Sequence, residues 1–292
     1  MKIIDILNTK ENSLSFEVFP PKTSDKYDSV QAATEAIAAL KPSFMSVTYG
    51  AGGGTSKYTL DIAKDINERY GVPSLAHLTC VSSTRETVKE KIADMKAAGI
   101  ENIMALRGDL TPDMEGKDRS DWAYQHAYQL IEDIKAYGDD FCIGAACYPE
   151  VHPESSNQAE DIKYLKEKVD AGVSFLTTQM FFDNNLFYNF LYKIREAGIT
   201  VPVIPGIMPI TNANQVERSI KLSGSFMPVR FKSLVDKFGD SPAAMKQAGI
   251  IYTTDQIIDL YANGIRNVHV YSMNKPDVAG AIMGNLSEIL AL

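Results

Sequence analysis

Acidic and histidine side chains occur inside or directly after short apolar runs of this sequence. Glu17 and His77 lie within two such runs, and Asp109 follows the end of a third. A carboxylic acid in apolar surroundings keeps its proton to higher pH and can act as a general acid, whereas an ionised carboxylate can stabilise a positive charge. Because a buried carboxylate without a partner is costly, Glu17 requires either a structural partner or a catalytic role.

Each of these residues also has a structural interpretation. An ion pair with Arg107 would account for Glu17, and a hydrogen-bonded core position would account for His77. Asp109 could cap the loop that follows it. A metal site built from His77, Asp109 and His152 would suit a lyase or a hydrolase. These three residues lack the close spacing typical of metal ligands, so we predict no metal site.

The elements that must position these residues repeat one plan, in which short β-branched runs alternate with segments of helical periodicity. Glycine follows several of the helical segments, as expected for helix ends. The predicted strands are Ser15–Phe19, Phe44–Tyr49, Ser74–Val81, Asn102–Arg107, Phe141–Tyr148, Ser174–Phe181, Val201–Ile207 and Asn267–Tyr271. The predicted helices between them are Ser29–Leu40, Lys57–Tyr70, Arg85–Ala98, Asp121–Ala136, Glu160–Ala171, Leu186–Ala197 and Ala213–Leu222.

Eight strands that alternate with helices predict an α/β fold, a (β/α)8 TIM barrel, with an open doubly wound sheet as the alternative. The 292 residues suit a barrel, which needs about 250, and we expect a single domain over residues 1–292. Extra helices are predicted between Pro228 and Gly264, before strand eight, and a C-terminal helix over Ala279–Leu292. Active sites of such barrels form at the C-terminal ends of the strands, which is where the polar residues gather.

A glycine-rich segment, Gly50-Ala51-Gly52-Gly53-Gly54-Thr55, resembles a dinucleotide-binding loop. The third glycine of that motif would fall at Thr55, and the acidic ribose-binding residue is missing. We therefore interpret the segment as a loop that closes over a ligand.

Composition excludes several classes of protein. Lys and Arg number 29 against 37 Asp and Glu, a net charge of −8, and no basic stripe is visible, so we predict no nucleic-acid partner. Neither a membrane span nor a signal peptide is recognisable, so we predict no membrane association and a cytoplasmic location. Cys80, Cys142 and Cys147 lack metal-binding spacing and fall in apolar runs, so we expect buried thiols.

Taken together, the motifs make this sequence resemble the methylenetetrahydrofolate reductase family over nearly the whole chain. The segments that carry the resemblance are Ser15-Phe16-Glu17-Val18-Phe19-Pro20-Pro21-Lys22, Val47-Thr48-Tyr49-Gly50, His77-Leu78-Thr79-Cys80, Leu106-Arg107-Gly108-Asp109, Tyr148-Pro149-Glu150-Val151-His152-Pro153-Glu154, Lys168-Val169-Asp170-Ala171-Gly172 and Thr178-Gln179-Met180-Phe181-Phe182-Asp183. The resemblance implies an oxidoreductase, a flavoprotein with FAD on the barrel. Such enzymes of one-carbon metabolism and methionine biosynthesis reduce 5,10-methylenetetrahydrofolate to 5-methyltetrahydrofolate with NADH or NADPH.

The resemblance also implies roles for individual residues. Glu17 matches the family's general acid, and Asp109 matches a carboxylate near flavin and pterin. Gln179 matches a residue that contacts the folate or the nicotinamide, and Lys275 stands near the folate tail. The positions that match flavin contacts are Thr48, His77, Arg107, Gly108, Asp109, Ala123, Tyr148, His152, Asp161 and Lys168.

Three positions depart from the family pattern. Ala213 replaces a phenylalanine that stacks on the folate or nicotinamide, Lys275 replaces an arginine, and Glu167 replaces a basic residue near the flavin phosphates. The change at Ala213 keeps open an alternative, a flavin-carrying subunit that depends on a protein electron donor. The resemblance also makes a homo-oligomer a candidate assembly, and the length leads us to expect no domain that binds S-adenosylmethionine.

Overall fold

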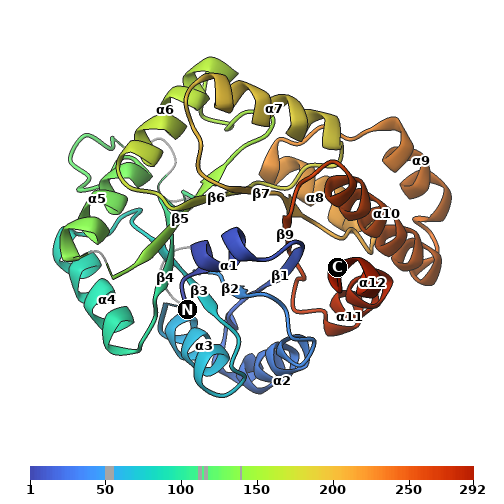
Figure 1. The fold of residues 1–292 in the computed structure, drawn as a ribbon, viewed down its shortest axis with the longest axis horizontal. Coiled ribbons are helices and arrows are strands. Elements are labelled where there is room, and N and C mark those ends of the chain that lie inside the picture. The colour runs from blue at the N-terminus through green and yellow to red at the C-terminus, as the bar shows by residue number, and fades with distance from the viewer. Residues whose placement is uncertain (50–55, 111–113, 115–117, 139) are drawn as a thin grey trace.

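The computed structural model describes residues 1–49, 56–110, 114, 118–138 and 140–292. The glycine-rich segment that resembles a dinucleotide-binding loop therefore lies outside the described residues. Within them the structure is a ring of parallel strands surrounded by helices (Figure 1).

In the described part of the chain nine short strands form one parallel sheet, which confirms the predicted TIM barrel. Their order around the sheet is β7-β6-β5-β4-β3-β2-β1-β9-β8. The bounds of the strands are β1 Ser13–Val18, β2 Met45–Val47, β3 Ser74–Thr79, β4 Asn102–Leu106, β5 Cys142–Cys147, β6 Phe175–Thr178, β7 Val203–Ile204, β8 Gly206–Ile207 and β9 Asn267–Val270.

The barrel closes through a strand that is broken in two. The sequence predicts one strand over Val201–Ile207, whereas the structure has β7 and β8 on either side of Pro205, which carries no N–H donor. The first half pairs with β6 and the second half pairs with β9. His269 N donates to Pro205 O at 3.0 Å, so the break lets one strand span the gap between two neighbours.

The helices lie outside the strands, as the sequence predicts, with a few differences at their ends. Helix α5 begins at Ala127 and not at Asp121, because Gln129 Oε1 accepts hydrogen bonds from the N–H groups of Gln125 and His126 just before it. The predicted C-terminal helix begins earlier and is broken near Leu286. The bounds are α2 Tyr27–Ala38, α3 Ser56–Glu68, α4 Arg85–Ala97, α5 Ala127–Tyr137, α6 Gln158–Asp170, α7 Asn184–Glu196, α8 Ala213–Ser223, α9 Val229–Phe238, α10 Pro242–Ala262, α11 Pro276–Asn285 and α12 Ser287–Leu290, with a 3-10 turn, η1, at Ser24–Lys26.

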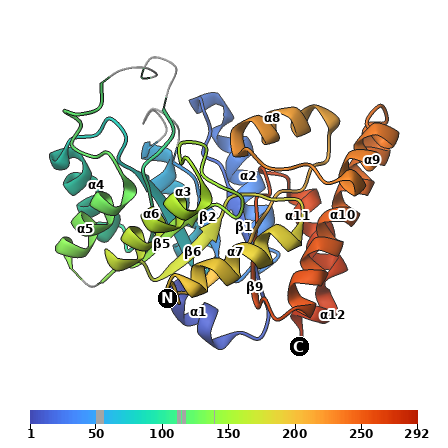
Figure 2. The same cartoon turned by 90° about the horizontal axis from the view of Figure 1, so that it is seen from above.

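A short helix absent from the predicted elements, α1 (Ile3–Thr9), covers the N-terminal end of the barrel (Figure 2). Its buried Ile3 and Leu7 pack with interior side chains such as Phe44 and Phe175. Asn102 Oδ1 accepts from Ile3 N at 2.8 Å, which fixes the start of the helix. This end of the barrel is therefore filled, and the C-terminal end remains for a site.

The predicted extra helices before the last strand, α9 and α10, are present and stand beside α8. Phe231 of α9 stacks on Phe182 after β6, with ring centroids 4.9 Å apart. Gly249 of α10 lies against the backbone at Ile210, where a Cβ atom would overlap the carbonyl oxygen. These contacts tie the extension to the loops that follow β6 and β8.

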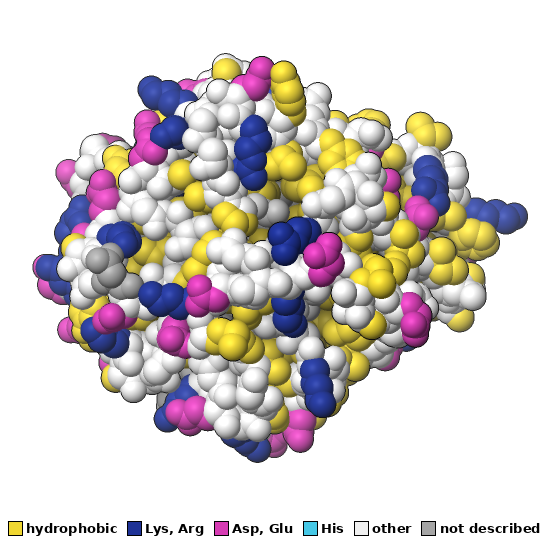
Figure 3. Space-filling view, viewed as in Figure 1, with side chains coloured by type: hydrophobic (Ala, Val, Ile, Leu, Met, Phe, Trp, Pro, Cys, Tyr) yellow, Lys and Arg dark blue, Asp and Glu magenta, His cyan; other side chains and the backbone are white. Residues whose placement is uncertain are grey.

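Charges of both signs are interspersed on the face seen in Figure 3, with apolar side chains between them. Among the described residues no helix is both long and apolar enough to cross a membrane. The three cysteines are buried free thiols, as predicted.

Candidate active site

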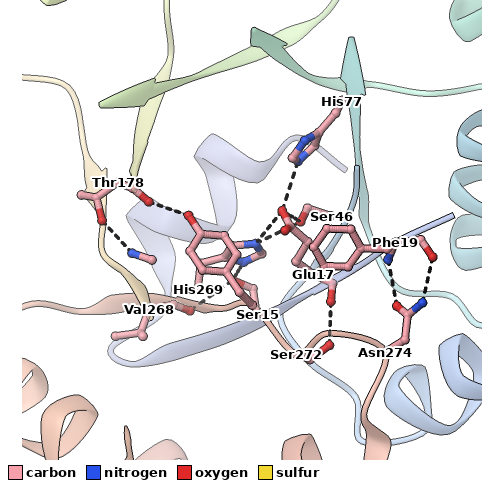
Figure 4. Close-up of polar contacts among 12 residues, drawn as sticks. Ser15, Glu17, Phe19, Ser46, His77, Thr178, Val268, His269, Ser272 and Asn274 are labelled. Carbon is pink, nitrogen blue, oxygen red and sulfur yellow. Dashed lines mark hydrogen bonds and ion pairs between the residues drawn. The ribbon is translucent and has the colours of Figure 1, made fainter. Parts of the chain in front are cut away.

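Glu17 lies inside the barrel near the C-terminal end of β1, with 6% of its surface exposed. Ser46 is its register partner on β2, and Ser46 Oγ lies 3.1 Å from Glu17 Oε2. Two histidines approach the same carboxylate oxygen, His77 Nε2 from β3 at 3.5 Å and His269 Nε2 from β9 at 3.9 Å (Figure 4). The carboxyl group is thus surrounded by one hydroxyl group and two imidazole rings.

His269 continues this cluster toward the barrel interior. Its Nε2 lies 3.0 Å from Ser46 Oγ and its Nδ1 lies 2.7 Å from Ser15 Oγ. The ring stacks on Phe44, with centroids 5.5 Å apart. Ser15, Ser46 and His269 are not among the site residues predicted from the sequence. Polar residues two positions apart on a strand share a face, so the alternation of Ser15 with Glu17 was the available signal.

His77 is buried, and its environment disfavours the charged imidazolium. Burial is the main cause that lowers the pKa of His77 to about 4, and the neighbouring carboxylate of Glu17 opposes this only in part. Nε2 has no hydrogen-bond partner despite its burial. An unsatisfied buried nitrogen beside the Glu17 carboxylate is suited to a ligand.

The low pKa of His77 has a consequence for stability. The unfolded state has the ordinary histidine pKa of 6.5 and binds this proton more readily than the folded state does. The stabilising contribution of neutral His77 to the free energy of unfolding is therefore fully present above pH 6.5 and is lost as pH falls toward 4. From pH 7 to 5, we expect wild type to lose about 2 kcal/mol more unfolding free energy than His77→Gln. Urea unfolding at both pH values measures this. An equal loss of unfolding free energy in His77→Gln and in wild type would contradict the expectation.

The segment after β9 anchors the end of β1. Ser272 Oγ donates to Glu17 O at 2.6 Å, and the Asn274 side chain both donates to Phe19 O and accepts from Phe19 N (Figure 4). Asn274 adopts a φ of 53°, a left-handed conformation that asparagine tolerates better than most residues. Lys275 Nζ donates to Thr211 Oγ1 at 2.9 Å, which places this predicted substrate residue beside the loop after β8.

Arg107 follows β4 and does not form the ion pair with Glu17 that was the structural alternative. Both of its terminal nitrogens donate to Glu154 at 2.7 Å, and Arg119 adds a contact to the same carboxylate. The hydrogen bonds from Arg107 are the main cause that lowers the pKa of Glu154 to about 2. This ion pair joins the loops after β4 and β5.

The predicted flavin residues of the β5 and α6 region lie together. The Tyr148 and His152 rings meet edge to face, with centroids 4.6 Å apart. Asp161 on α6 accepts hydrogen bonds from His152 N and Ser155 Oγ, which fixes the loop after β5. Lys168, about two turns further along α6, donates from Nζ to Ala146 O at 2.6 Å, and burial lowers its pKa.

The remaining predicted residues lie in the segments that follow β2, β4 and β6. Asp109 is exposed, and Gly108 before it has a φ of 95° that favours glycine. Gln179 follows β6, where its N–H donates to Cys147 O. Thr48 follows β2, and Ala123 lies in the turn before α5 and not on a helix as predicted. Across the described residues, no three His, Cys, Asp or Glu side chains are grouped as metal ligands would be.

Comparisons with known proteins agree with this arrangement. The profile of the methylenetetrahydrofolate reductase family matches residues 2–287. A protein of Pectobacterium carotovorum subsp. carotovorum named 5,10-methylenetetrahydrofolate reductase is 36% identical over 274 residues, which cover 94% of this chain and 90% of the relative. The maize (Zea mays) protein named methylenetetrahydrofolate reductase (NADH) 1 is 34% identical over 99% of this chain, but the chain spans only 50% of that relative.

A solved structure supports the fold. It is titled an uncharacterized protein from Clostridium thermocellum that binds two copies of 5-methyl-5,6,7,8-tetrahydrofolic acid, and it covers 100% of this chain with a TM-score of 0.64 at 14% identity. At that identity the likeness concerns the barrel alone. Because the family profile spans nearly the whole chain and a bacterial relative matches along most of its own length, this chain belongs to the methylenetetrahydrofolate reductase family.

Proposed function

We propose that this chain is a flavoenzyme that reduces 5,10-methylenetetrahydrofolate to 5-methyltetrahydrofolate, and that residues 1–292 form one catalytic barrel. The observation that carries the proposal is the buried carboxyl group of Glu17, held by Ser46 and approached by two histidines at the C-terminal end of the strands. Membership of the family and the names of the relatives support the substrate and the reaction.

The residues present are compatible with FAD. His77 Nε2 is a buried polar atom without a hydrogen-bond partner, and the cationic groups of Lys168 on α6 and of Arg107 after β4, the latter paired with Glu154, would meet a pyrophosphate. When bound, FAD would supply the hydride that reduces the folate. The residues that we propose to hold it are Thr48, His77, Arg107, Gly108, Asp109, Ala123, Tyr148, His152, Asp161 and Lys168.

The side chains of the chain itself prepare the folate for reduction. Glu17 would donate a proton to the departing nitrogen, so that the five-membered ring opens and a cationic iminium forms at N5. The carboxylate of Asp109 would stabilise that cation and bind the pterin amino group. Gln179 and Lys275 would bind other parts of the substrate, Lys275 as a single cation and not as a bidentate grip.

We propose NADH or NADPH as the electron donor, and the name of the maize relative favours NADH. Ala213 supports a second candidate, a flavin subunit that receives electrons from a partner protein. Its Cβ lies against Gly239 at the end of α9, where a glycine Cβ would approach it to 3.1 Å. Residue 213 is therefore packed on one side against the end of α9.

Anaerobic half-reactions test the proposal. NADH, then NADPH, is mixed with the oxidised holoenzyme, and bleaching of the flavin absorbance is followed; 5,10-methylenetetrahydrofolate is then added to the reduced enzyme. We expect bleaching by a nicotinamide and recovery of absorbance with the folate. Recovery with folate but no bleaching by either nucleotide would favour the protein donor. No recovery with folate would contradict the proposed reaction.

A further inference from the structure

A chain of buried polar groups leads from Glu17 into the barrel. It runs from Glu17 Oε2 to Ser46 Oγ at 3.1 Å, on to His269 Nε2 at 3.0 Å, and from Nδ1 to Ser15 Oγ at 2.7 Å. Ser15 Oγ ends the chain by donating to Val268 O at 3.1 Å. Both serines have no exposed surface and His269 has 2%, so these groups can satisfy one another but not bulk water.

All the contacts along this chain can be hydrogen bonds at the same time in only one tautomer of His269. A carbonyl oxygen cannot donate, so the single hydroxyl hydrogen of Ser15 goes to Val268 O. Ser15 Oγ must then accept from the imidazole, which requires a hydrogen on Nδ1. In the neutral ring Nε2 is therefore an acceptor, and only in the imidazolium is it a donor.

Ser46 also has one hydroxyl hydrogen, although it faces two partners. If His269 is neutral, Ser46 donates to Nε2, and Glu17 must carry a proton to donate to Ser46. If Glu17 is ionised, Ser46 donates to the carboxylate, and Nε2 must carry a proton to donate to Ser46. Every contact is satisfied when Glu17 and His269 together hold one proton in addition to the hydrogen on Nδ1 of His269. When they hold no additional proton, one buried acceptor, either Nε2 or the carboxylate, loses its partner.

We propose that His269 acts through Ser46 as a proton relay to Glu17, so that one proton is shared between the buried imidazole and the carboxyl group. His269 and Ser46 are positioning residues, because the substrate would meet only Glu17. The inference rests on the proposed function, in which Glu17 is the general acid. It adds a reason why a carboxyl group in this place keeps a proton to donate.

The transfer balances without any further reactant. The O–H bond of Ser46 breaks as its hydrogen bonds to Glu17 Oε2, and the N–H bond of His269 Nε2 breaks as its hydrogen bonds to Ser46 Oγ. Imidazolium and carboxylate become neutral imidazole and carboxylic acid. The reverse movement returns the proton, and no group is oxidised or reduced.

The titratable groups around the pair do not compete for this proton near neutral pH. His77 from β3 is neutral, with a pKa of about 4 caused mainly by burial. Burial raises the pKa of Tyr271 from β9 well above its ordinary value, and raises those of Tyr148 and Cys147 at the end of β5 to about 12. Of the titratable groups in this cluster, Glu17 and His269 are the two that Ser46 joins by hydrogen bonds.

The relay predicts matched defects in two variants. We expect Ser46→Ala and His269→Gln each to slow reoxidation of the reduced flavin by 5,10-methylenetetrahydrofolate about tenfold. We also expect the alkaline fall of that rate to begin about one pH unit lower, since one pH unit corresponds to the same tenfold change. Flavin reduction by the donor should be unchanged. The double variant should lose no more than either single variant, because both break one path.

The matched control is Ser13→Ala, which removes a hydroxyl on the same face of β1 that bonds Asn267 Oδ1 at 2.6 Å, one layer below the relay. It should keep the wild-type pH profile. Profiles of Ser46→Ala and His269→Gln that match wild type apart from a constant factor would mean that both residues only support the structure. Multiplied losses in the double variant would likewise overturn the relay.

A second measurement does not depend on turnover. The chain contains four histidines, so ¹⁵N-histidine NMR of the holoenzyme should resolve each ring, with His269 assigned by its loss in His269→Gln. In Glu17→Gln, the amide donates to Ser46, Ser46 donates to Nε2, and neutral His269 is satisfied without sharing a proton. We expect its signals to change at a pH lower by about one unit or more than in wild type.

Unchanged His269 signals in Glu17→Gln would overturn the relay. If wild-type enzyme fails to react with the folate but these signals move as expected, the proposed function fails and the proton sharing stands. If the folate reacts but the signals and pH profiles do not move, the function stands and the relay fails. The two proposals are therefore tested separately.

Discussion

Replacing Glu17 by glutamine is expected to slow the folate half-reaction by about 10²- to 10⁴-fold, the usual contribution of a general acid. Glutamine keeps the size of the side chain and can still bond Ser46, but it has no proton to give to the departing nitrogen. Reduction of the flavin by its donor needs no such proton and should proceed at the wild-type rate. Stopped-flow absorbance of the two half-reactions measures both effects.

A suitable control is Glu11→Gln, which removes an exposed carboxylate just before β1. It should leave both half-reactions unchanged. The absorbance of bound flavin shows whether Glu17→Gln is correctly folded. If both half-reactions fell together in a flavin-loaded variant, Glu17 would have a structural role and its assignment as the acid would be wrong.

Replacing Lys168 by methionine is expected to weaken FAD binding by about 10- to 100-fold, because a hydrogen bond between charged groups contributes about 1.5–3 kcal/mol. Lys168 Nζ is held at 2.6 Å from Ala146 O, at the end of a strand, so little ordering is required when an anion arrives. Burial lowers the pKa of Lys168, and a bound anion would oppose this effect because it stabilises the charged ammonium group. Titration of apoprotein with FAD, followed by flavin fluorescence, measures the affinity.

Lys166→Met is the matched control for this effect. Lys166 lies on the same helix, α6, but is more exposed and forms an ion pair with Asp170 one turn later. We expect this variant to bind FAD as wild type does, since exposed pairs of this kind contribute little. Equal FAD affinity in Lys168→Met and wild type would contradict the role of Lys168 at the pyrophosphate.

The barrel itself could be predicted because its signals are local. An apolar run followed by a helical period and a glycine recurs along the chain, and each repeat reports one strand and one helix. The extra helices α9 and α10 were visible as an interruption of that period. The placement of Glu17, His77 and Lys275 at one end followed from the parallel order of the strands, and their family motifs agreed with it.

Features that depend on contacts between separate segments of the chain could not be predicted from the sequence. The short helix α1 is stabilised by burial of Ile3 and Leu7 under the barrel, which its own sequence does not reveal. The split of the predicted seventh strand at Pro205 depends on which neighbour each half must reach. Arg107 pairs with Glu154 and not with Glu17, because the loops after β4 and β5 lie side by side.

The sequence by itself determined the order and type of the elements, the family motifs and the end of the barrel that carries the polar residues. Only the tertiary structure decided which groups surround Glu17. Ser46 is 29 positions away from it, while the Ser15–His269 contact joins residues 254 positions apart. Periodicity reports how a residue faces within its own element, whereas strand register and barrel closure set contacts between distant elements. The buried chain from Glu17 to His269 therefore appears only once the last strand pairs with the first.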